Sequence, residues 1–405
     1  LVDSSLHQLE IRQREITGSG MPFGLQIMLT CLPACIHNDD PLNILDLDNA
    51  FNVIKERLNR DNYIEGLIEK HLINNPHKLN YSLVPDTEFN RRNEEAIVKK
   101  VHQKTESLTI DDKNKIVALA EDLEKRQERI DDPEILPKVT KEDIPLSRNY
   151  PNPNISVVNN IENYFYKSGT NGLVYHSMLF PCEALTIDEL KIASLFTSSL
   201  TDIGLGSDSY EDVQKYQSSI TGGISASFTM IPNKGDSKHK LALKISGKSL
   251  EKNAHLMQDL MIRTVQEANF SEHQRIQELL SFISADNEQS LTQNGHVLAM
   301  ANAASQLTEV ASTNDLTSGI RFINNTGLLS KNIGDEGSLD IYIKNLKSIQ
   351  SKISLTPKNI FTASSLNQDE MDLKSFSGLN AADVDEQNFI KVQDKSIGWI
   401  TGSQV

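Results

Sequence analysis

The chain has 405 residues, more than one hydrophobic core usually organises, so two or three structural units are expected. Its 38% hydrophobic and 23% charged residues indicate a globular protein, and no apolar run approaches the roughly eighteen residues of a membrane-spanning helix. A net charge of −15 argues against nucleic acid as a partner and fits cationic peptides or simple solubility. No targeting segment opens the chain, which starts at Leu1, and we expect the natural start to be missing.

The first ninety residues alternate helix signals with breakers. Apolar residues at helical spacing predict helices, and alternation near residue 80 predicts a strand that closes this unit. The predicted helices are Val2–Ile16, Phe23–Ile36, Leu47–Leu58 and Tyr63–Ile73, and the predicted strand is Leu79–Leu83. Three cysteines are too few for a disulfide framework and suggest a reducing compartment or indifference to redox. Cys31 and Cys35 lack a second pair that could complete a zinc site, so we interpret them as core residues.

Residues 90–132 are predicted to form a charged helical hairpin. Sparse apolar residues at helical spacing give a narrow stripe that can cover one seam only. Thr109 is placed to cap the second helix, with Asp112 bonding back. Five prolines then fall within about twenty residues and indicate a stiff linker and a domain boundary.

Beyond the linker the pattern becomes mixed. It predicts strands at Asn160–Tyr166, Gly172–Phe180, Ile224–Met230 and Lys240–Ser246. It also predicts helices at Asp188–Ile203, Tyr210–Ile220, Ala254–Ala268, Glu272–Ile283, Val297–Val310 and Ser338–Ile353. Hairpins followed by helices indicate the α+β class: a layer sandwich with helices packed on one face of a mostly antiparallel sheet. Strand-like segments at Asn359–Ala363 and Phe389–Val392 resemble the opening of a further domain.

The histidines and serines of this chain do not form a catalytic motif. Zinc hydrolases place two His one helical turn apart beside a Glu, so that both imidazoles reach one metal. His7-Gln8-Leu9-Glu10 approaches H-x-x-E-H, but Ile11 stands where the second His is needed. His71, His77, His176 and His296 are isolated, and neither a G-x-S-x-G elbow nor a phosphate-binding glycine loop occurs. We therefore assign no catalytic and no metal-binding residue.

Six stretches, in order along the chain, resemble the pitrilysin/insulinase-type zinc metallopeptidases, in the presequence-protease (falcilysin-like) branch. They are Leu6–Ile11 with Gln13–Glu15, Gly20–Leu25, Asn75–His77, Leu136–Val139 with Asp143–Pro145, Thr170–Gly172, and Tyr216 through Thr221–Ala226. The resemblance implies four related α+β domains, two on each side of the hairpin, closing over a chamber in which unstructured peptides are cut. It places residues 1–88 at the end of the second domain, 89–135 in the hairpin and 136–153 in the proline-rich linker. Residues 154–357 would be a third, non-catalytic domain, and 358–405 the start of the fourth.

The resemblance also implies where the chemistry lies. Zinc and its ligands would belong to the first domain and an Arg/Tyr pair to the later part of the fourth, both outside this chain. The zinc-binding helix would correspond to Asp188–Ile203. This segment has no His, and its apolar residues Leu190, Leu195, Phe196 and Leu200 would pack in the core instead of holding a metal. The candidates for contact with substrate are Gly222, Gly223, Ile224, Ser225 and Ala226, although the glycine pair better suits a turn with positive φ.

The expected partners are the remaining domains of the same polypeptide and peptide substrates. Neither nucleic acid nor a membrane is expected as a partner, and the full-length enzyme is expected to be a monomer. A bacterial protein would be cytoplasmic and a eukaryotic one organellar. Two alternatives stay open. The chain could be a self-sufficient scaffold whose charged hairpin docks a partner, or one chain of a split two-subunit peptidase.

Overall fold

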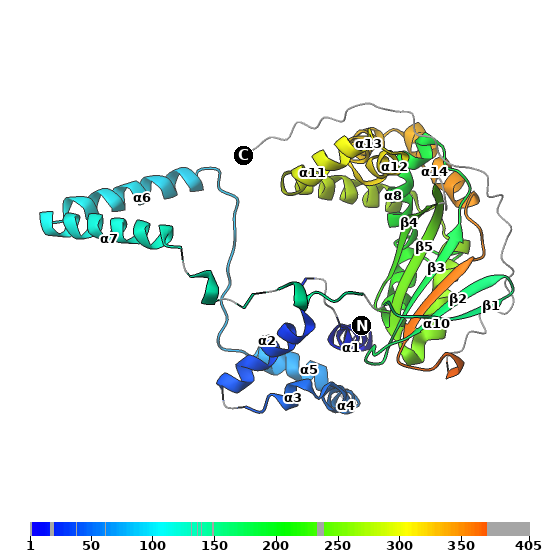
Figure 1. The fold of residues 1–405 in the computed structure, drawn as a ribbon, viewed down its shortest axis with the longest axis horizontal. Helices are drawn as coiled ribbons and strands as arrows, with labels where there is room; N and C mark the ends of the chain where they lie inside the picture. The colour runs from blue at the N-terminus through cyan, green and yellow to red at the C-terminus, as the bar shows by residue number, and fades with distance from the viewer. Residues whose placement is uncertain are drawn as a thin grey trace. The chain divides into compact units, whose positions relative to one another are not determined.

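The computed structural model describes residues 2–370, apart from residues 17–19, 38, 61, 131, 136, 139, 148, 149 and 233–238. The chain divides into two compact units (Figure 1). One comprises residues 1–53 and 151–405, and the other comprises residues 54–150. Among the described residues, no helix combines the length and apolarity needed to cross a membrane.

The larger unit is built on a six-stranded sheet in the order β1-β2-β6-β3-β5-β4. All neighbouring strands pair antiparallel except β2 and β6, which run parallel. The strands are β1 (Asn154–Val158), β2 (Ile161–Lys167), β3 (Leu173–Pro181), β4 (Ile224–Pro232), β5 (His239–Leu250) and β6 (Asn359–Ser364). The predicted α+β class with a mostly antiparallel sheet is confirmed.

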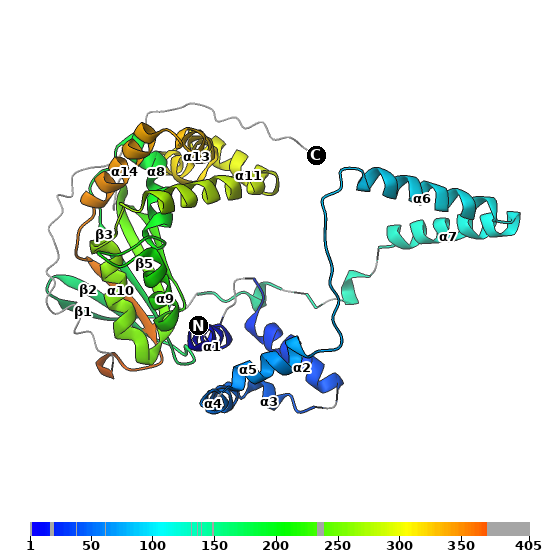
Figure 2. The ribbon, with the colours of Figure 1, turned by 180° about the vertical axis from the view of Figure 1, so that it is seen from behind.

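Helices pack on one face of this sheet (Figures 1 and 2). They are α8 (Ile187–Leu200), α9 (Tyr210–Ile220), α10 (Ala254–Gln266), α11 (His273–Ala304), α12 (Glu309–Ser318), α13 (Ile320–Asn332) and α14 (Glu336–Ser351). Short 3₁₀ turns lie at Glu251–Asn253 and Gln368–Glu370. Alternate strand residues such as Met178 and Leu243 are fully buried against the helices, in one cluster with Leu195, Met261 and Leu346. This cluster is the hydrophobic core of the unit.

Two features of the helical layer differ from the prediction. Glu272–Ile283 and Val297–Val310 were predicted as separate helices, but α11 runs without a break through most of both. The residues between them, such as Asp286 and Glu288, are polar, so the amphipathic pattern fades where the helix leaves the core although the backbone stays helical. Strand β1 and helices α12 and α13 were not predicted.

Strand β6 corrects the predicted domain boundary. Asn359–Ala363 was placed in the opening of a further domain, but β6 lies between β2 and β3 inside the same sheet. The strand signal itself was right, because Ile360 and Thr362 alternate with more exposed neighbours. Its partners lie nearly 200 residues earlier in the chain. The predicted strand Phe389–Val392 lies outside the described residues.

The N-terminal helices of the larger unit are α1 (Val2–Arg14), α2 (Phe23–Ile36), α3 (Leu42–Leu45) and the start of α4 (Leu47–Leu58). Helix α1 packs on α9 and against the end of the sheet, where Ile11 is buried with Leu173 and Leu250. Only Ala34 is buried on α2, and the helix leaves most of its large apolar side chains exposed, namely Leu25, Met28, Leu29, Leu32 and Ile36. The core role predicted for Cys31 and Cys35 is therefore wrong, since Cys31 is half-buried and Cys35 is exposed.

The smaller unit contains α5 (Tyr63–Ile68), a turn of π-helix (Glu69–Ile73), and the pair α6 (Phe89–Glu106) and α7 (Ile110–Glu128), followed by 3₁₀ turns at Pro133–Ile135 and Lys141–Asp143. The two predicted helices and the turn between them are present, and Thr109 and Asp112 form the predicted reciprocal cap of α7, but neither helix has a buried residue, so the predicted seam is not covered. The strand predicted at Leu79–Leu83 is wrong: the segment is irregular and its apolar side chains are exposed. Alternation marks a strand only where a neighbouring strand can pair with it.

Candidate functional site

Helix α8 lies over strand β4 and is held there by apolar packing. Leu190, Leu195, Phe196 and Leu200 are each at most 1% exposed. The Phe196 ring stacks on Phe228 of β4 and on Phe270, with centroid separations of 6.1 and 5.5 Å. The sequence prediction that these residues form the buried face of the helix is confirmed.

The N-terminus of α8 is fixed by a buried carboxylate. Thr186 and Glu189 form a reciprocal cap, in which the Thr186 backbone N–H donates to Glu189 Oε2 at 2.7 Å. Lys352 Nζ lies 2.6 Å from the same oxygen, and Ser348 Oγ donates to Oε1 at 2.8 Å. Burial acts to raise the pKa of Glu189, but these hydrogen bonds outweigh it and the pKa is lowered. The carboxylate therefore stays charged at neutral pH and ties α8 to α14.

The glycine turn before β4 is occupied by helix α1. A Cβ on Gly222 would lie 2.7 Å from Ile11 Cγ2 and 3.0 Å from Lys248 Cγ, so only glycine lets α1 approach this closely. Gln8 Nε2 of α1 donates to the carbonyl of Thr221 at 2.6 Å, and Lys248 Nζ lies 2.7 Å from Glu15 Oε1. Gly223 has φ +108, which side chains rarely adopt. Gly222 is therefore required by the close approach of α1, and Gly223 by its positive φ.

The remaining substrate candidates run along β4 away from that turn. Ile224 is buried against the core, Ser225 is exposed and Ala226 packs on the core cluster. Strand β4 stands at the end of the strand order. A pocket of about 200 Å³ lies further along it, between β4, α8 and α12. Contact with substrate at Gly222–Ala226 stays a prediction.

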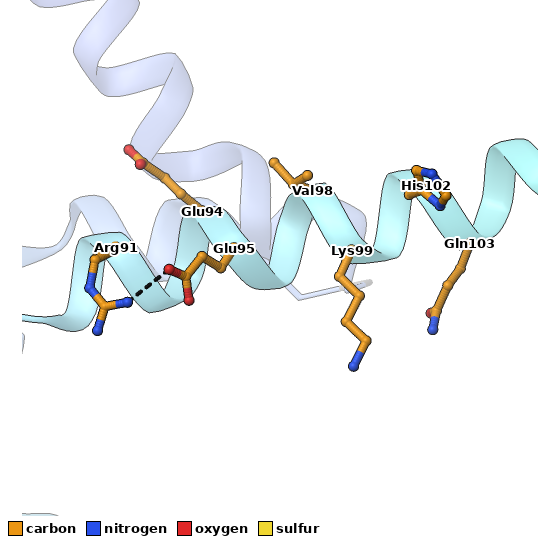
Figure 3. A pocket seen from close by; sticks show the side chains of 7 residues that line it. All are labelled: Arg91, Glu94, Glu95, Val98, Lys99, His102 and Gln103. Carbon is orange, nitrogen blue, oxygen red and sulfur yellow. Dashed lines mark hydrogen bonds and ion pairs between the residues drawn. The ribbon is translucent and has the colours of Figure 1, made fainter.

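A second concavity follows the exposed surface of α6. Figure 3 shows its lining side chains, which all come from this one helix and include Arg91, Glu95 and His102. Arg91 Nη1 lies 2.8 Å from Glu95 Oε1, and His102 Nδ1 lies 3.5 Å from Glu106. Both contacts are exposed and join residues one helical turn apart, an arrangement that stabilises an isolated helix. Groups from a single helix face do not converge on a ligand, so we give this surface no catalytic role.

A sequence profile for the region associated with peptidases of family M16, subfamily C, matches residues 83–328, more than half of the chain. The chain belongs to this family. The presequence protease of Yarrowia lipolytica, described as mitochondrial, is 26% identical over 89% of this chain and 36% of its own length. Presequence protease 1 of Arabidopsis thaliana, described as chloroplastic/mitochondrial, is 25% identical over 83% of this chain and 32% of its own length. The resemblance to the pitrilysin/insulinase-type peptidases is confirmed, and the chain spans about a third of the length of these relatives.

A solved structure of a conserved protein from Enterococcus faecalis V583 aligns with 56% of this chain and 51% of that one, at 12% identity and a TM-score of 0.38. This value is too low to support a comparison of the two folds.

The histidines of this peptidase-associated chain are dispersed. His176 is buried under α10, with Nδ1 2.8 Å from Thr362 Oγ1, and burial lowers its pKa to about 3, so the ring is neutral. His71 and His77 are exposed on the smaller unit, and His7 lies on α1 beside Gln8. Within the part of the chain that the structure describes, no three His, Cys, Asp or Glu side chains are grouped as a metal site would need.

Sequence reasoning missed the pocket beside β4. Its described walls come from residues 190–197, 227–230 and 313–318 and from Leu241, which lie far apart in the chain. The one local signal is the run of hydroxyl and amide residues at Ser312–Asn314 and Thr317–Ser318, which is unusual in a helix interior.

Proposed function

We propose that this chain is the non-catalytic, chamber-forming and hinge portion of a zinc metalloendopeptidase that degrades unstructured, targeting-peptide-like substrates. The observation that carries the proposal is the similarity to presequence proteases over 89% and 83% of this chain. The similarity occupies only about a third of each relative, which leaves ample length for a catalytic domain elsewhere in such a protein.

The described residues do not fit zinc. No grouping of three ligand side chains occurs among them, and helix α8 carries no His or Cys. In this proposal the metal is held by another part of the parent enzyme, and α8 is the packed counterpart of the helix that holds it. What this chain contributes is a wall that excludes bulk water and a surface that holds the peptide.

The proposed partners are the other domains of the same polypeptide and peptide substrates, without nucleic acid or membrane, in an enzyme that acts as a monomer. For a eukaryotic protein we propose an organelle, because the similar presequence proteases are described as mitochondrial or chloroplastic. A bacterial protein would act in the cytoplasm.

The test compares this chain with the product of the whole reading frame that contains it. Both are dialysed against zinc-free buffer, analysed for metal and incubated with a quenched fluorogenic peptide of twenty to thirty unstructured residues. We expect the longer product to retain zinc and cleave, and this chain to do neither. Stoichiometric zinc on this chain, or cleavage by it that is lost in His7→Ala, would contradict the proposal.

A second candidate function is a protein-binding scaffold that uses the helical pair α6 and α7. The observation in its favour is that large apolar side chains stay more than half exposed on both helices, including Ile97 and Val101 on α6 and Leu119 and Leu123 on α7. The flanking reading frame separates the two candidates. The peptidase requires an upstream H-x-x-E-H in the same frame, whereas the scaffold requires a frame without it.

A further inference from the structure

Helix α1 is held on the larger unit by one stripe of its surface. Gln8, Ile11 and Glu15 follow one another at intervals of three and four residues, which places them on one face of the helix. Gln8 Nε2 donates to the carbonyls of Ser218 and Thr221, each at 2.6 Å. These carbonyls lie at the C-terminal end of α9, where the last carbonyl groups of a helix lack partners within the helix. A side chain of α1 therefore caps α9.

The other two residues of this stripe reach the strands. Ile11 is 2% exposed and packs on Leu173 at the start of β3 and on Leu250 at the end of β5. Lys248 Nζ of β5 lies 2.7 Å from Glu15 Oε1. One apolar contact between two polar ones thus fixes both the position and the register of α1 on the sheet.

The attachment of α1 is separate from the main hydrophobic core. Ile11, Leu173 and Leu250 form a buried cluster of their own, apart from the cluster around Leu243. Within Val2–Arg14, all of which the structure describes, Glu10 and Ile11 are the only buried residues. A segment with few buried contacts opens at a lower free energy than the strands of the core do. Since breaking the small cluster leaves the main cluster intact, α1 can leave the sheet while the sheet stays folded.

Helix α1 also carries the segment that follows it. The Arg14 guanidinium pairs with Asp48 of α4, so α1 is joined to the later part of residues 1–53. Among the described residues of α2, α3 and α4, only Ala34 and Phe51 are buried. Of the helices α1–α4, α1 makes the extensive described contact with the rest of the larger unit, on α9. Undocking of α1 would therefore free the whole segment.

We propose that α1 is a releasable clasp. It docks in a socket formed by the end of α9, the Gly222 turn and the ends of β3 and β5, and it detaches as one unit together with residues 1–53. The proposal rests on the proposed function and deepens it. There, residues 1–88 and 154–357 belong to different domains, so the clasp joins two domains and its release lets a peptide enter between them.

Hydrogen exchange of the 405-residue chain, followed by mass spectrometry at neutral pH, tests the separate release of α1. Ile11→Ala removes the buried contact, and Leu9→Ala is the matched control because Leu9 is 44% exposed on the same helix. We expect α1 to exchange at least about tenfold faster than the central residues of β3 and β5, but more slowly than a free peptide of residues 1–16. Ile11→Ala should speed exchange of α1 about tenfold further and leave the two strands unchanged. Leu9→Ala should exchange as the unmodified chain does.

A disulfide between Ile11→Cys and Gly222→Cys locks the clasp. A Cβ on Gly222 would lie 2.7 Å from Ile11 Cγ2, which is bonded to Ile11 Cβ. The two Cβ atoms are thus no more than about 4.2 Å apart, within the usual range of a disulfide. In the longer product that contains this chain, we expect oxidation of this pair to slow cleavage of the fluorogenic peptide at least about tenfold, and a non-thiol reductant to restore it. Leu9→Cys with Gly222→Cys is the control, in which cleavage should not depend on oxidation.

Four results would contradict the clasp. They are exchange of α1 at the rate of β3 and β5, exchange of α1 as fast as in the free peptide, equal exchange in the Ile11→Ala and Leu9→Ala variants, and a locked product that cleaves as fast as the reduced one. The last result refutes the clasp and leaves the proposed peptidase in place. Separate exchange of α1, with neither zinc nor cleavage in the longer product, refutes the peptidase and leaves the clasp in place.

Discussion

Replacing Phe196 by alanine should destabilise the larger unit far more than the same truncation of a surface phenylalanine. Phe196 is fully buried between Phe228 and Phe270, at centroid separations of 6.1 and 5.5 Å. Truncation of such a ring removes its transfer free energy, leaves a cavity under β4 and loses two stacked partners. The combined cost is about 3–5 kcal/mol. For a unit of this size that corresponds to a fall in melting temperature of roughly 6–20 °C.

Circular dichroism during thermal and urea unfolding measures this cost. Phe282→Ala is the matched control, because Phe282 lies on α11 with 71% of its surface exposed and should change stability by less than about 0.5 kcal/mol. Equal melting temperatures for the two variants would refute the packing of α8 on β4, and with it the pocket that this packing shapes.

Three further predictions concern α1, the buried histidine and the hairpin. Gly222→Ala should lower the unfolding free energy by about 1–3 kcal/mol, because its methyl group overpacks against Ile11. The double variant Gly222→Ala with Ile11→Ala should lose less than the sum of the two single variants, as a double-mutant cycle in urea will measure. Burial lowers the pKa of His176 from 6.5 to about 3. As the pH drops below 6.5, the unfolded chain takes up a proton at this residue while the folded chain does not. The unfolding free energy therefore falls between pH 6.5 and 3, by up to about 1.4 kcal/mol per pH unit. Urea midpoints between pH 7 and 4 should therefore fall less in His176→Gln than in the unmodified chain, and parallel curves would contradict the buried, neutral ring. Leu119→Gln should change the unfolding free energy by less than about 0.5 kcal/mol, because Leu119 is 70% exposed on α7; a loss of 2 kcal/mol or more would mean that the seam of the hairpin is closed.

Local signals predicted the elements that carry both a cap and a full apolar face. Helix α9 begins and ends at the predicted residues, since Ser209 caps it and Val213 and Ile220 face the core. The start of helix α7 was located by the Thr109–Asp112 cap, whereas the hairpin was predicted to run to residue 132 and α7 ends at Glu128.

The pairing of strands that lie far apart in the chain could not be predicted from the sequence. The strand at Asn359–Ser364 was found, but its alternation does not say that it inserts between β2 and β3. Strand Leu79–Leu83 has the same alternation and forms no strand, because pairing and not the pattern supplies the backbone hydrogen bonds. The pocket beside β4 was missed for a related reason. Phe228 and Thr313 become neighbours of one pocket only through the packing of α8 and α12 on the sheet.

The cysteines show how composition misleads when a helix has no partner. Cys31 and Cys35 follow a strongly apolar run, and such residues are usually buried. In the larger unit, however, the surface of α2 around them stays exposed among the described residues, with Ala34 as its one buried side chain. An apolar helix predicts that something covers it, but not which part of the protein does so.

The central claim is that this chain is the non-catalytic portion of a zinc peptidase, and zinc-dependent cleavage tests it most directly. Equimolar samples of this chain and of the product of the complete reading frame, each loaded with zinc and dialysed, are assayed with the same unstructured fluorogenic peptide. The account predicts cleavage by the longer product that a chelator stops and zinc restores, and none by this chain. Turnover by this chain itself, or a longer product that binds no zinc and leaves the peptide intact, would contradict it.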